Sequence, residues 1–278
     1  MKYFPNHNQV RDWIKRGLQE DLGKGDITTD NIFSKDIEWQ AEIIAKEKLI
    51  VCGISFFKET FLFLDDKTLL KSYYSDGDLV ESNEKILTMQ GKASVLLKGE
   101  RTALNILQRL SGIATLTNEF VKLAGKIKIL DTRKTIPGLR VFEKYAVFCG
   151  GADNHRFGLF DAIMIKDNHI KVAGSIKEAV SKIKMNLKGS FKIEIETCNL
   201  QEVKQALSCG VDRIMLDNMS LDEMKEAVKQ INKQTEIEVS GGITKESIKD
   251  MSDLDVDYFS IGSLTNSSRA ADISMRFL

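Results

Sequence analysis

The sequence has few of the residues that mark disulfide-rich or nucleic-acid-binding proteins. Among its 278 residues there are four cysteines, two prolines and three histidines. The cysteines form no Cys-x-x-Cys pair and share no short spacing with a histidine, so neither a zinc site nor a disulfide framework is indicated. Reduced thiols are expected instead. Forty basic side chains balance forty acidic ones, so no global field attracts nucleic acid or an anionic membrane.

Long apolar runs are also missing. No segment approaches the roughly 18 apolar residues of a membrane span, and the opening stretch MKYFPNHNQVRDWIK lacks the apolar centre of a signal peptide. We therefore expect a cytoplasmic protein that binds neither membranes nor nucleic acid. The length and the 42% hydrophobic content suit one large α/β domain or two smaller ones.

The first hundred residues mix helical and strand patterns. Residues 8–20 place apolar side chains on one helical face, 38–51 indicate strands, and 53–64 indicate a buried helix. A turn-rich loop is expected at 20–30, and Asp-Gly and Gln-Gly pairs within 73–97 suggest small antiparallel hairpins. This part is typical of an α+β domain.

A long helical pattern covers 100–124, with an expected break at Ser111-Gly112. The pattern of apolar residues changes after it. From residue 127 onward, six short apolar strands alternate with amphipathic helices, which predicts a parallel sheet. The expected strand ends are Asp131, Lys166, Glu196, Asp217, Ser240 and Gly262. The last four ends are spaced by about one strand plus one helix, which favours an α/β barrel, although a complete barrel needs eight strands.

Two glycine loops follow the last two strands. SGGIT at 240–244 and IGSLT at 261–265 each precede a helical pattern, and Thr244 is a candidate N-cap. A single glycine turn is common without a ligand, but backbone N–H groups in a tandem pair at the end of a barrel suit phosphate. The candidate phosphate residues are Ser240, Gly241, Gly242, Gly262 and Ser263.

Cationic residues gather around the first two strands of this series. They are Arg133, Lys134, His155, Arg156 and Lys166. A basic run is usually a solvated face, but Lys166 closes an apolar strand, where a charge is costly unless it is paired. Arginine and lysine side chains bind carboxylates and phosphates, so these residues predict an anion site.

Two carboxylates, Glu196 and Asp217, end neighbouring strands. Either one alone reads as a helix cap or a surface charge. Together they could bind the hydroxyls of a sugar or coordinate Mg²⁺, which prefers oxygen ligands and substrate phosphates. His169 is expected only to pack or to cap a loop, and His7 to lie on the surface. The residue types thus imply a sugar phosphate and a second anionic partner.

The sequence resembles the quinolinate phosphoribosyltransferases over nearly its whole length. The motifs are EDLGKGDITTD at 20–30, GERTALNILQRLSGIATLT at 99–117, DTRKTIPGLR at 131–140, EKYAVFCGGADNHRFGLFDAIMIKDNHI at 143–170, IEIET at 193–197, IMLDN at 214–218 and SGGI at 240–243. The resemblance implies an N-terminal α/β sandwich over 1–110 and an open, seven-stranded α/β barrel over 111–264. Residues 265–278 are candidates for packing back on the first domain.

The resemblance also implies residue roles. The catalytic residues are Lys166, Glu196 and Asp217, the last two also holding Mg²⁺ directly or indirectly. The substrate-binding residues are Arg101, Thr132, Arg133, Lys134, His155, Arg156 and Lys166. Arg101 is implied to reach the neighbouring active site of a homodimer, and a larger oligomer stays open. Many members have a glycine at the position of Ala152 and a histidine at that of Asn266, so a phosphate contact by that histidine is not carried over.

The reaction implied joins quinolinate to phosphoribosyl pyrophosphate and yields nicotinate mononucleotide, pyrophosphate and CO₂, a step of NAD biosynthesis. Two alternatives are open at this point. One is a paralogue on the same scaffold, such as the ModD-like proteins of molybdenum loci, acting on another acidic ring. The other is a silent binder of sugar phosphates, which would not need the full set of charged strand ends.

Overall fold

A computed structural model describes residues 4–33 and 37–278, and the chain divides into two compact units. Unit 1 comprises the chain up to Asn118, Ile136–Gly151 and Leu264–Leu278, and unit 2 comprises Glu119–Thr135 and Ala152–Ser263. The helix α4 (Ala93–Ala124) crosses the expected domain boundary at residues 110 and 111. Within the described residues, no helix is both long and apolar enough to cross a membrane.

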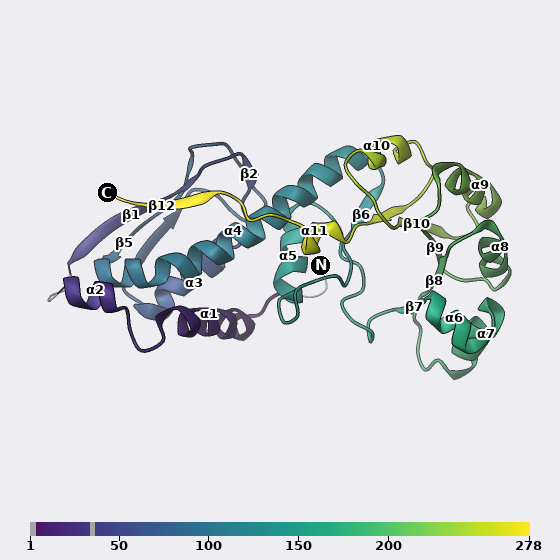
Figure 1. Cartoon of the computed structure of the whole chain (residues 1–278), viewed down its shortest axis with the longest axis horizontal. Helices are drawn as coiled ribbons and strands as arrows, with labels where there is room; N and C mark the ends of the chain where they lie inside the picture. Colours follow the sequence, from purple (N-terminus) through teal and green to yellow (C-terminus); the bar gives the residue numbers. More distant parts are fainter. Residues whose placement is uncertain (1–3, 34–36) are drawn as a thin grey trace. The chain divides into compact units, whose positions relative to one another are not determined.

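Unit 1 is built on a four-stranded antiparallel sheet. Its strands, in spatial order, are β12 (Ile273–Phe277), β1 (Glu38–Ala45), β5 (Lys85–Lys92) and β3 (Leu69–Ser72). A separate pair joins β2 (Leu49–Ile50) to β4 (Leu79–Val80). β12 lies beside β1 with Phe277 opposite Ala41, as the ribbon of Figure 1 shows. The last residues of the chain therefore complete the sheet of unit 1.

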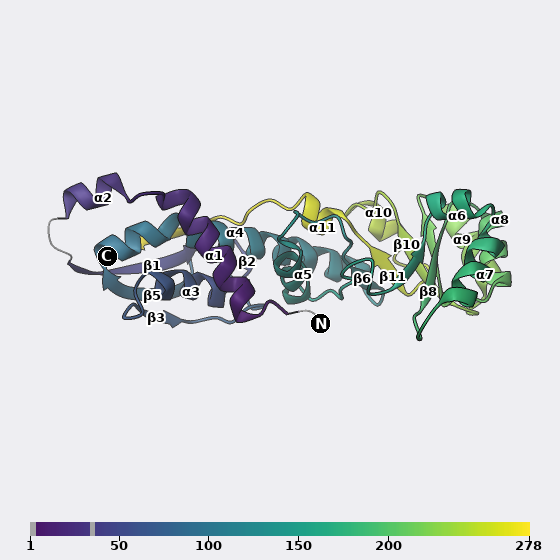
Figure 2. The ribbon, with the colours of Figure 1, turned by 90° about the horizontal axis from the view of Figure 1, so that it is seen from below.

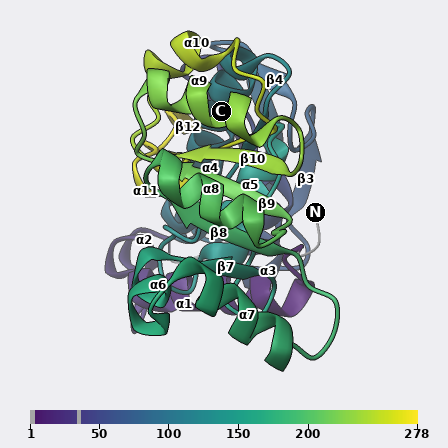
Figure 3. The ribbon, with the colours of Figure 1, turned by 90° about the vertical axis from the view of Figure 1, so that its right-hand side faces the viewer.

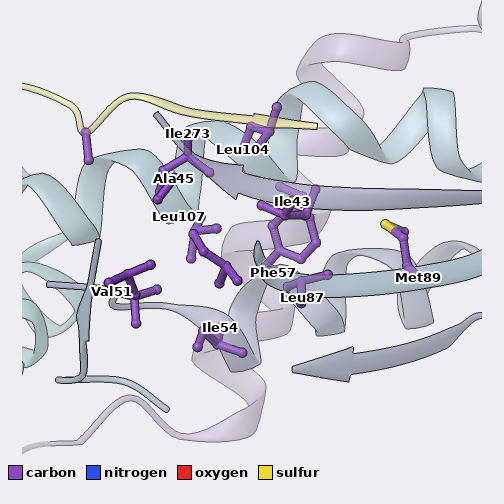
Figure 4. Close-up of a cluster of buried hydrophobic side chains, with 14 of the residues drawn as sticks. Ile43, Ala45, Val51, Ile54, Phe57, Leu87, Met89, Leu104, Leu107 and Ile273 are labelled. Atoms are coloured by element: carbon purple, nitrogen blue, oxygen red, sulfur yellow. The ribbon is translucent and has the colours of Figure 1, made fainter. Parts of the chain in front are cut away.

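Two helices, α3 and α4, cover one face of this sheet. The helices of unit 1 are α1 (His7–Leu22), α2 (Ile27–Ile32), α3 (Ile54–Leu64), α4 and α5 (Arg140–Cys149), and the short α11 (Ser263–Asn266) begins at its boundary. In the core, Phe57 of α3 lies beside Ile43 and Leu87 of the sheet, and Leu107 of α4 is also fully buried (Figure 4). α1 packs against α3 (Figure 2).

Three local expectations for this unit were wrong. Gln90-Gly91 lies inside β5 and makes no turn. Residues 27–32 of the expected loop form α2, because the Asp26 side chain accepts hydrogen bonds from the backbone of Thr28 and Thr29 and caps a helix there. The helix α4 also begins earlier than expected, at Ala93.

A further expectation, a helix break at Ser111-Gly112, was also wrong, because α4 continues there without a break. Ser111 is fully buried, and its Oγ accepts a hydrogen bond from the backbone N–H of Cys52 at 3.0 Å. A Cβ on Gly112 would lie 2.0 Å from the carbonyl oxygen of Arg269. The two small residues therefore allow other backbone segments to approach the helix closely.

Unit 2 is an open parallel α/β barrel, as predicted. All six predicted strands are present, in the spatial order β6 (Lys128–Leu130), β11 (Tyr258–Ser260), β10 (Glu236–Ser240), β9 (Arg213–Asp217), β8 (Ile193–Thr197) and β7 (Ile163–Ile165). A single parallel bridge between Leu130 and Asp153 extends the sheet beyond β6. The described residues therefore form six barrel strands, where the resemblance implied seven.

Helices cover the outer side of this sheet. They are α6 (Asp167–Ala173), α7 (Ile176–Asn186), α8 (Leu200–Ser208), α9 (Leu221–Ile231) and α10 (Ser247–Met251). In Figure 3, α8 and α9 lie in front of the strands that they connect. The alternation of strand and helix sends every strand in the same direction, so the strand ends with their loops meet at one edge.

The close approach of Arg269 to α4 can be tested with Gly112→Ala. Alanine favours a helix over glycine by about 1 kcal/mol, yet here its Cβ would collide with a backbone carbonyl. We expect the variant to lower the free energy of unfolding by about 2 kcal/mol or more. Urea titration measures this change. In the same titration Asn105→Ala, on an exposed face of the same helix, should be neutral or slightly stabilising. Equal effects of the two variants would contradict the packing described.

Candidate active site

The charged residues predicted for unit 2 lie at the carboxyl edge of its parallel sheet. Register on neighbouring strands places Asp217 of β9 opposite Ser240 of β10, and Ser240 opposite Ser260 of β11. Glu196 lies one residue before the end of β8. In such a sheet this edge is where catalytic side chains and loops converge.

Lys166 and Glu196 form an ion pair at this edge. The Nζ of Lys166 is 2.5 Å from Oε2 of Glu196, and the lysine side chain is 43% exposed. The backbone N–H of Lys166 donates to Nδ1 of His169 at 2.9 Å, so His169 caps the start of α6 as expected. The ammonium group of Lys166 is accessible and could contact a ligand while it stays close to Glu196.

Two arginines lie near each other at the same edge. Arg156 is only 9% exposed, and one of its guanidinium nitrogens donates to the carbonyl oxygen of Ala162 at 3.2 Å. Burial and the neighbouring charge of Arg133 lower the pKa of Arg156. Two guanidinium groups held together repel each other, and an anion between them relieves that repulsion.

Asp131 holds the two segments that carry these arginines side by side. Its buried carboxylate accepts hydrogen bonds from the Asn154 amide and from the backbone N–H of His155, both at 2.8 Å. The Thr132 Oγ1 accepts from the backbone N–H of Lys134 at 3.0 Å and shapes the turn that follows β6. Asp131 is predicted only as a strand end, and its contacts give it a structural role as well.

His155 directs its ring into the interior of the barrel. Its Nδ1 accepts a hydrogen bond from the backbone N–H of Arg156 at 2.7 Å. Its Nε2 lies 3.3 Å from a carboxylate oxygen of Glu194 and 3.4 Å from one of Glu238. The contact of His155 with the substrate stays a prediction, because the structure engages both ring nitrogens within the protein.

This interior layer of charge was missed by the sequence reasoning. Glu238 also accepts from Arg213 at 2.9 Å, and the guanidinium of Arg213 lies 4.0 Å from the ring centre of Tyr258. A signal was available, because alternate residues of a strand share a face. Glu194 lies two residues before Glu196 and Glu238 two before Ser240, so both point the same way as residues already selected.

The electrostatics of the layer favour a charged imidazole. Burial alone lowers the pKa of His155, but the carboxylates of Glu194 and Glu238 outweigh burial and raise it to about 9. Burial raises the pKa of Glu194. Burial also acts to raise the pKa of Glu238, but the interaction with His155 outweighs burial, so the pKa of Glu238 is lowered. In the geometry seen, Nδ1 accepts from the Arg156 N–H, so the proton of the ring is on Nε2 and a second proton on Nδ1 would break that hydrogen bond. The contacts of Nε2 with Glu194 and Glu238 tie the arginine segment to the sheet.

The two glycines of the first loop, Gly241 and Gly242, are required for different reasons. Gly241 has φ 92°, and a Cβ there would lie 2.4 Å from the side chain of Asn218, so packing demands glycine. Gly242 has φ 62° with open space around it, which leaves its backbone accessible. The expected cap was misplaced, because α10 begins at Ser247 and Thr244 precedes it, although Thr244 Oγ1 accepts from the Ser247 N–H at 3.2 Å.

The remaining predicted residues lie in the second loop and in unit 1. Gly262 precedes α11, and Ser263 is its first residue. Arg101 is exposed on α4 in unit 1, where it lines a cavity of about 380 Å³ together with Trp13, Asp21 and Asn105. The structure thus gathers the predicted residues of unit 2 at one edge and places Arg101 in the other unit. Neither placement tests the roles assigned to them.

Comparisons with known proteins agree across the whole chain. The sequence models of the quinolinate phosphoribosyl transferase N-terminal and C-terminal domains match residues 26–111 and 113–276. A probable nicotinate-nucleotide pyrophosphorylase [carboxylating] of Bacillus subtilis is 44% identical over 97% of this chain and 94% of its own length. One of Methanocaldococcus jannaschii is 43% identical over 94% and 95%. The crystal structure of NadC from Streptococcus pyogenes superposes with a TM-score of 0.94 at 40% identity, covering 98% of both chains.

The charge of His155 can be tested through the pH dependence of stability. Its pKa is about 6.5 in an unfolded chain and about 9 here, so the stabilisation is complete below pH 6.5 and is lost as the pH rises through 9. Relative to His155→Gln, the native protein should lose on the order of 2 kcal/mol of unfolding free energy between these pH values. A pH-independent difference for His155→Gln would rule out the charged form.

Proposed function

This chain belongs to the quinolinate phosphoribosyltransferase family, and we propose that it transfers the phosphoribosyl group of phosphoribosyl pyrophosphate to quinolinate with loss of CO₂. The products are nicotinate mononucleotide and pyrophosphate, which places the reaction in de novo NAD biosynthesis. We also propose a cytoplasmic location, which the four free cysteines support.

The observation that carries the proposal is the mixed charge at the carboxyl edge of the barrel. Quinolinate carries two carboxylates on adjacent ring carbons, and the guanidinium groups of Arg133 and Arg156 at this edge suit carboxylates. Lys166 adds a point charge whose head is accessible beside Glu196. An edge that carries both cations and carboxylates suits a dicarboxylate next to a ribose.

In the proposed reaction the quinolinate ring nitrogen attacks the anomeric carbon as pyrophosphate leaves. The bond to the leaving oxygen breaks ahead of the new C–N bond, so the ribose develops positive charge. Glu196 and Asp217, at the ends of neighbouring strands, lie where negative charge stabilises that ribose. Much of the rate comes from holding two anions together that otherwise repel.

Magnesium fits the donor chemistry of the same carboxylates. Mg²⁺ in enzymes is held by one or two carboxylates together with substrate phosphates and water, and Glu196 and Asp217 supply such oxygens. When bound, the ion neutralises the departing pyrophosphate. The open backbone at Gly242 and the turn at Gly262-Ser263 would bind the phosphates of the substrate.

Loss of CO₂ follows from the chemistry of the new bond. Once the ring nitrogen carries the ribose, the ring is a pyridinium, and it accepts the electron pair released as the adjacent carboxylate departs. A proton then takes the place of CO₂ on that carbon. The protein therefore has only to orient the remaining carboxylate, and the cations at this edge serve that purpose.

We further propose a homodimer in which Arg101 of one subunit completes the site of its partner. Two features support a covering subunit. Arg101 is exposed on its own unit. In unit 2 a cavity of about 600 Å³ beside the edge strand β7 is lined by apolar side chains, and Leu159 and Phe160 there are 73% and 68% exposed. Exposed apolar surface of this kind marks an interface.

The role of Lys166 predicts the effect of Lys166→Ala on the purified enzyme. With both substrates and Mg²⁺, we expect kcat/KM for quinolinate to fall roughly 10²- to 10³-fold, because removal of one member of a hydrogen-bonded charge pair leaves Glu196 uncompensated. Lys171→Ala, on the exposed face of α6, is the matched control and should retain activity. Full activity of Lys166→Ala with quinolinate would contradict the assignment to quinolinate. The assignment would also fail if the protein catalysed phosphoribosyl transfer to another acceptor and Lys166→Ala left that reaction unchanged.

The shared site predicts complementation between inactive subunits. If Arg101 acts in the partner, a dimer of Arg101→Ala with Lys166→Ala subunits contains one intact site, so random mixing should restore about a quarter of native activity. Mixing Lys166→Ala with Glu196→Gln should restore none, since both lesions lie in the barrel. No recovery in the first mixture would show that Arg101 does not act across subunits.

A further inference from the structure

Two cysteines far apart in the sequence lie together in unit 1. Cys52 follows β2 and is fully buried, and Cys149 is the half-buried last residue of α5. Their sulfur atoms and a carboxylate oxygen of Asp76 all lie within 4.8 Å of one another. Neither cysteine belongs to the strand ends of the barrel, so the proposed transferase reaction does not account for the pair.

Hydrogen bonds hold the surroundings of the pair in place. One oxygen of Asp76 accepts from the backbone N–H groups of Gly53 and Ile54, both at 2.9 Å. The other accepts from the Tyr145 hydroxyl at 2.7 Å. The backbone of Cys52 is bound to Ser111 on both sides, through its N–H at 3.0 Å and its carbonyl oxygen at 3.3 Å. These hydrogen bonds hold the backbone beside Cys52 in place, and the two sulfurs already lie within 4.8 Å of each other.

The two thiols are not equivalent. A hydrogen bond from Cys52 lowers the pKa of Cys149, while burial raises the pKa of Cys52 well above its usual range. Cys149 is also the more exposed of the two. A thiolate is the reactive form of cysteine, so Cys149 has the properties of an attacking thiol and Cys52 those of a resolving thiol that only its neighbour can reach.

We propose that Cys52 and Cys149 form an oxidation site at which a peroxide converts the two thiols into a disulfide. The Cys149 thiolate attacks one peroxide oxygen, the O–O bond breaks, and a sulfenic acid forms as hydroxide or alkoxide leaves and takes up a proton. The Cys52 sulfur then attacks the sulfur of Cys149 and water departs. Two thiols and one hydrogen peroxide thus give one disulfide and two waters.

A metal site is the other use of these ligands, and the observations favour the disulfide. The carboxylate of Asp76 already accepts three hydrogen bonds, so a metal ion would displace one of these donors. Two thiolates and a carboxylate around a divalent ion would also leave net negative charge in a buried place, which is costly. A disulfide is neutral and leaves every hydrogen bond of Asp76 in place.

Peptide mapping of the full-length protein tests the proposal. The reduced protein is treated with a small excess of hydrogen peroxide, alkylated and digested. We expect a Cys52–Cys149 linked peptide that dithiothreitol removes, with Cys198 and Cys209 still alkylated. Cys209→Ser should leave the link unchanged, and Cys52→Ser should stop at a sulfenic acid on Cys149. Oxidation of the exposed Cys198 before any link forms would overturn the proposal, as would stoichiometric Zn²⁺ that protects both unoxidised thiols from alkylation.

Thermal unfolding gives a second readout that does not depend on digestion. The new bond would close a long loop, so the native protein should gain roughly 5–10 °C in Tm on peroxide treatment. Cys149→Ser should show no gain and should keep its transferase activity. An equal gain in Cys149→Ser would show that the link is not the cause. Because the readouts are separate, an inactive enzyme that still forms the link would refute the proposed function and leave this site standing.

Discussion

Repulsion between like charges held at one edge of a parallel sheet is the constraint on which the rest of the site depends. Arg156 is nearly buried, and the charge of Arg133 is close enough to lower its pKa. Such an arrangement is costly in the free protein, and an anionic ligand offsets the cost. The same edge carries Glu196 and Asp217, so the site suits a ligand pair with anionic groups on one side and a positively charged transition state on the other.

A second layer of charge beneath this edge holds the first in position. Asp131 fixes the backbone of the segment that carries Arg156, and His155 anchors the same segment to buried carboxylates of β8 and β10. Asp131 and His155 are both largely buried and hold this segment through contacts within the protein. Contacts inside the barrel therefore fix the position of the arginine segment, and the arginines themselves act at the carboxyl edge of the sheet.

The sequence was most informative where a single element decides the outcome. All six barrel strands could be predicted, because short apolar runs alternating with amphipathic helices leave few other folds. Two features depend on residues far away in the sequence. Ser111 and Gly112 suggest a helix break by residue type, and only the close approach of Arg269 explains why small residues occur within the helix. The inward turn of His155 depends on the distant carboxylates of Glu194 and Glu238. The cap at Asp26 is a local signal, and the glycines that precede it favoured a loop instead.

In the proposed reaction, phosphoribosyl transfer at this edge is coupled to the loss of one carboxylate. The most direct test is to supply the purified protein with Mg²⁺ and quinolinate labelled with ¹⁴C in the carboxylate next to the ring nitrogen. We expect labelled CO₂ only when phosphoribosyl pyrophosphate is present, with one CO₂ released for each pyrophosphate formed. Binding of phosphoribosyl pyrophosphate without CO₂ release, or pyrophosphate formed with the label retained, would contradict it.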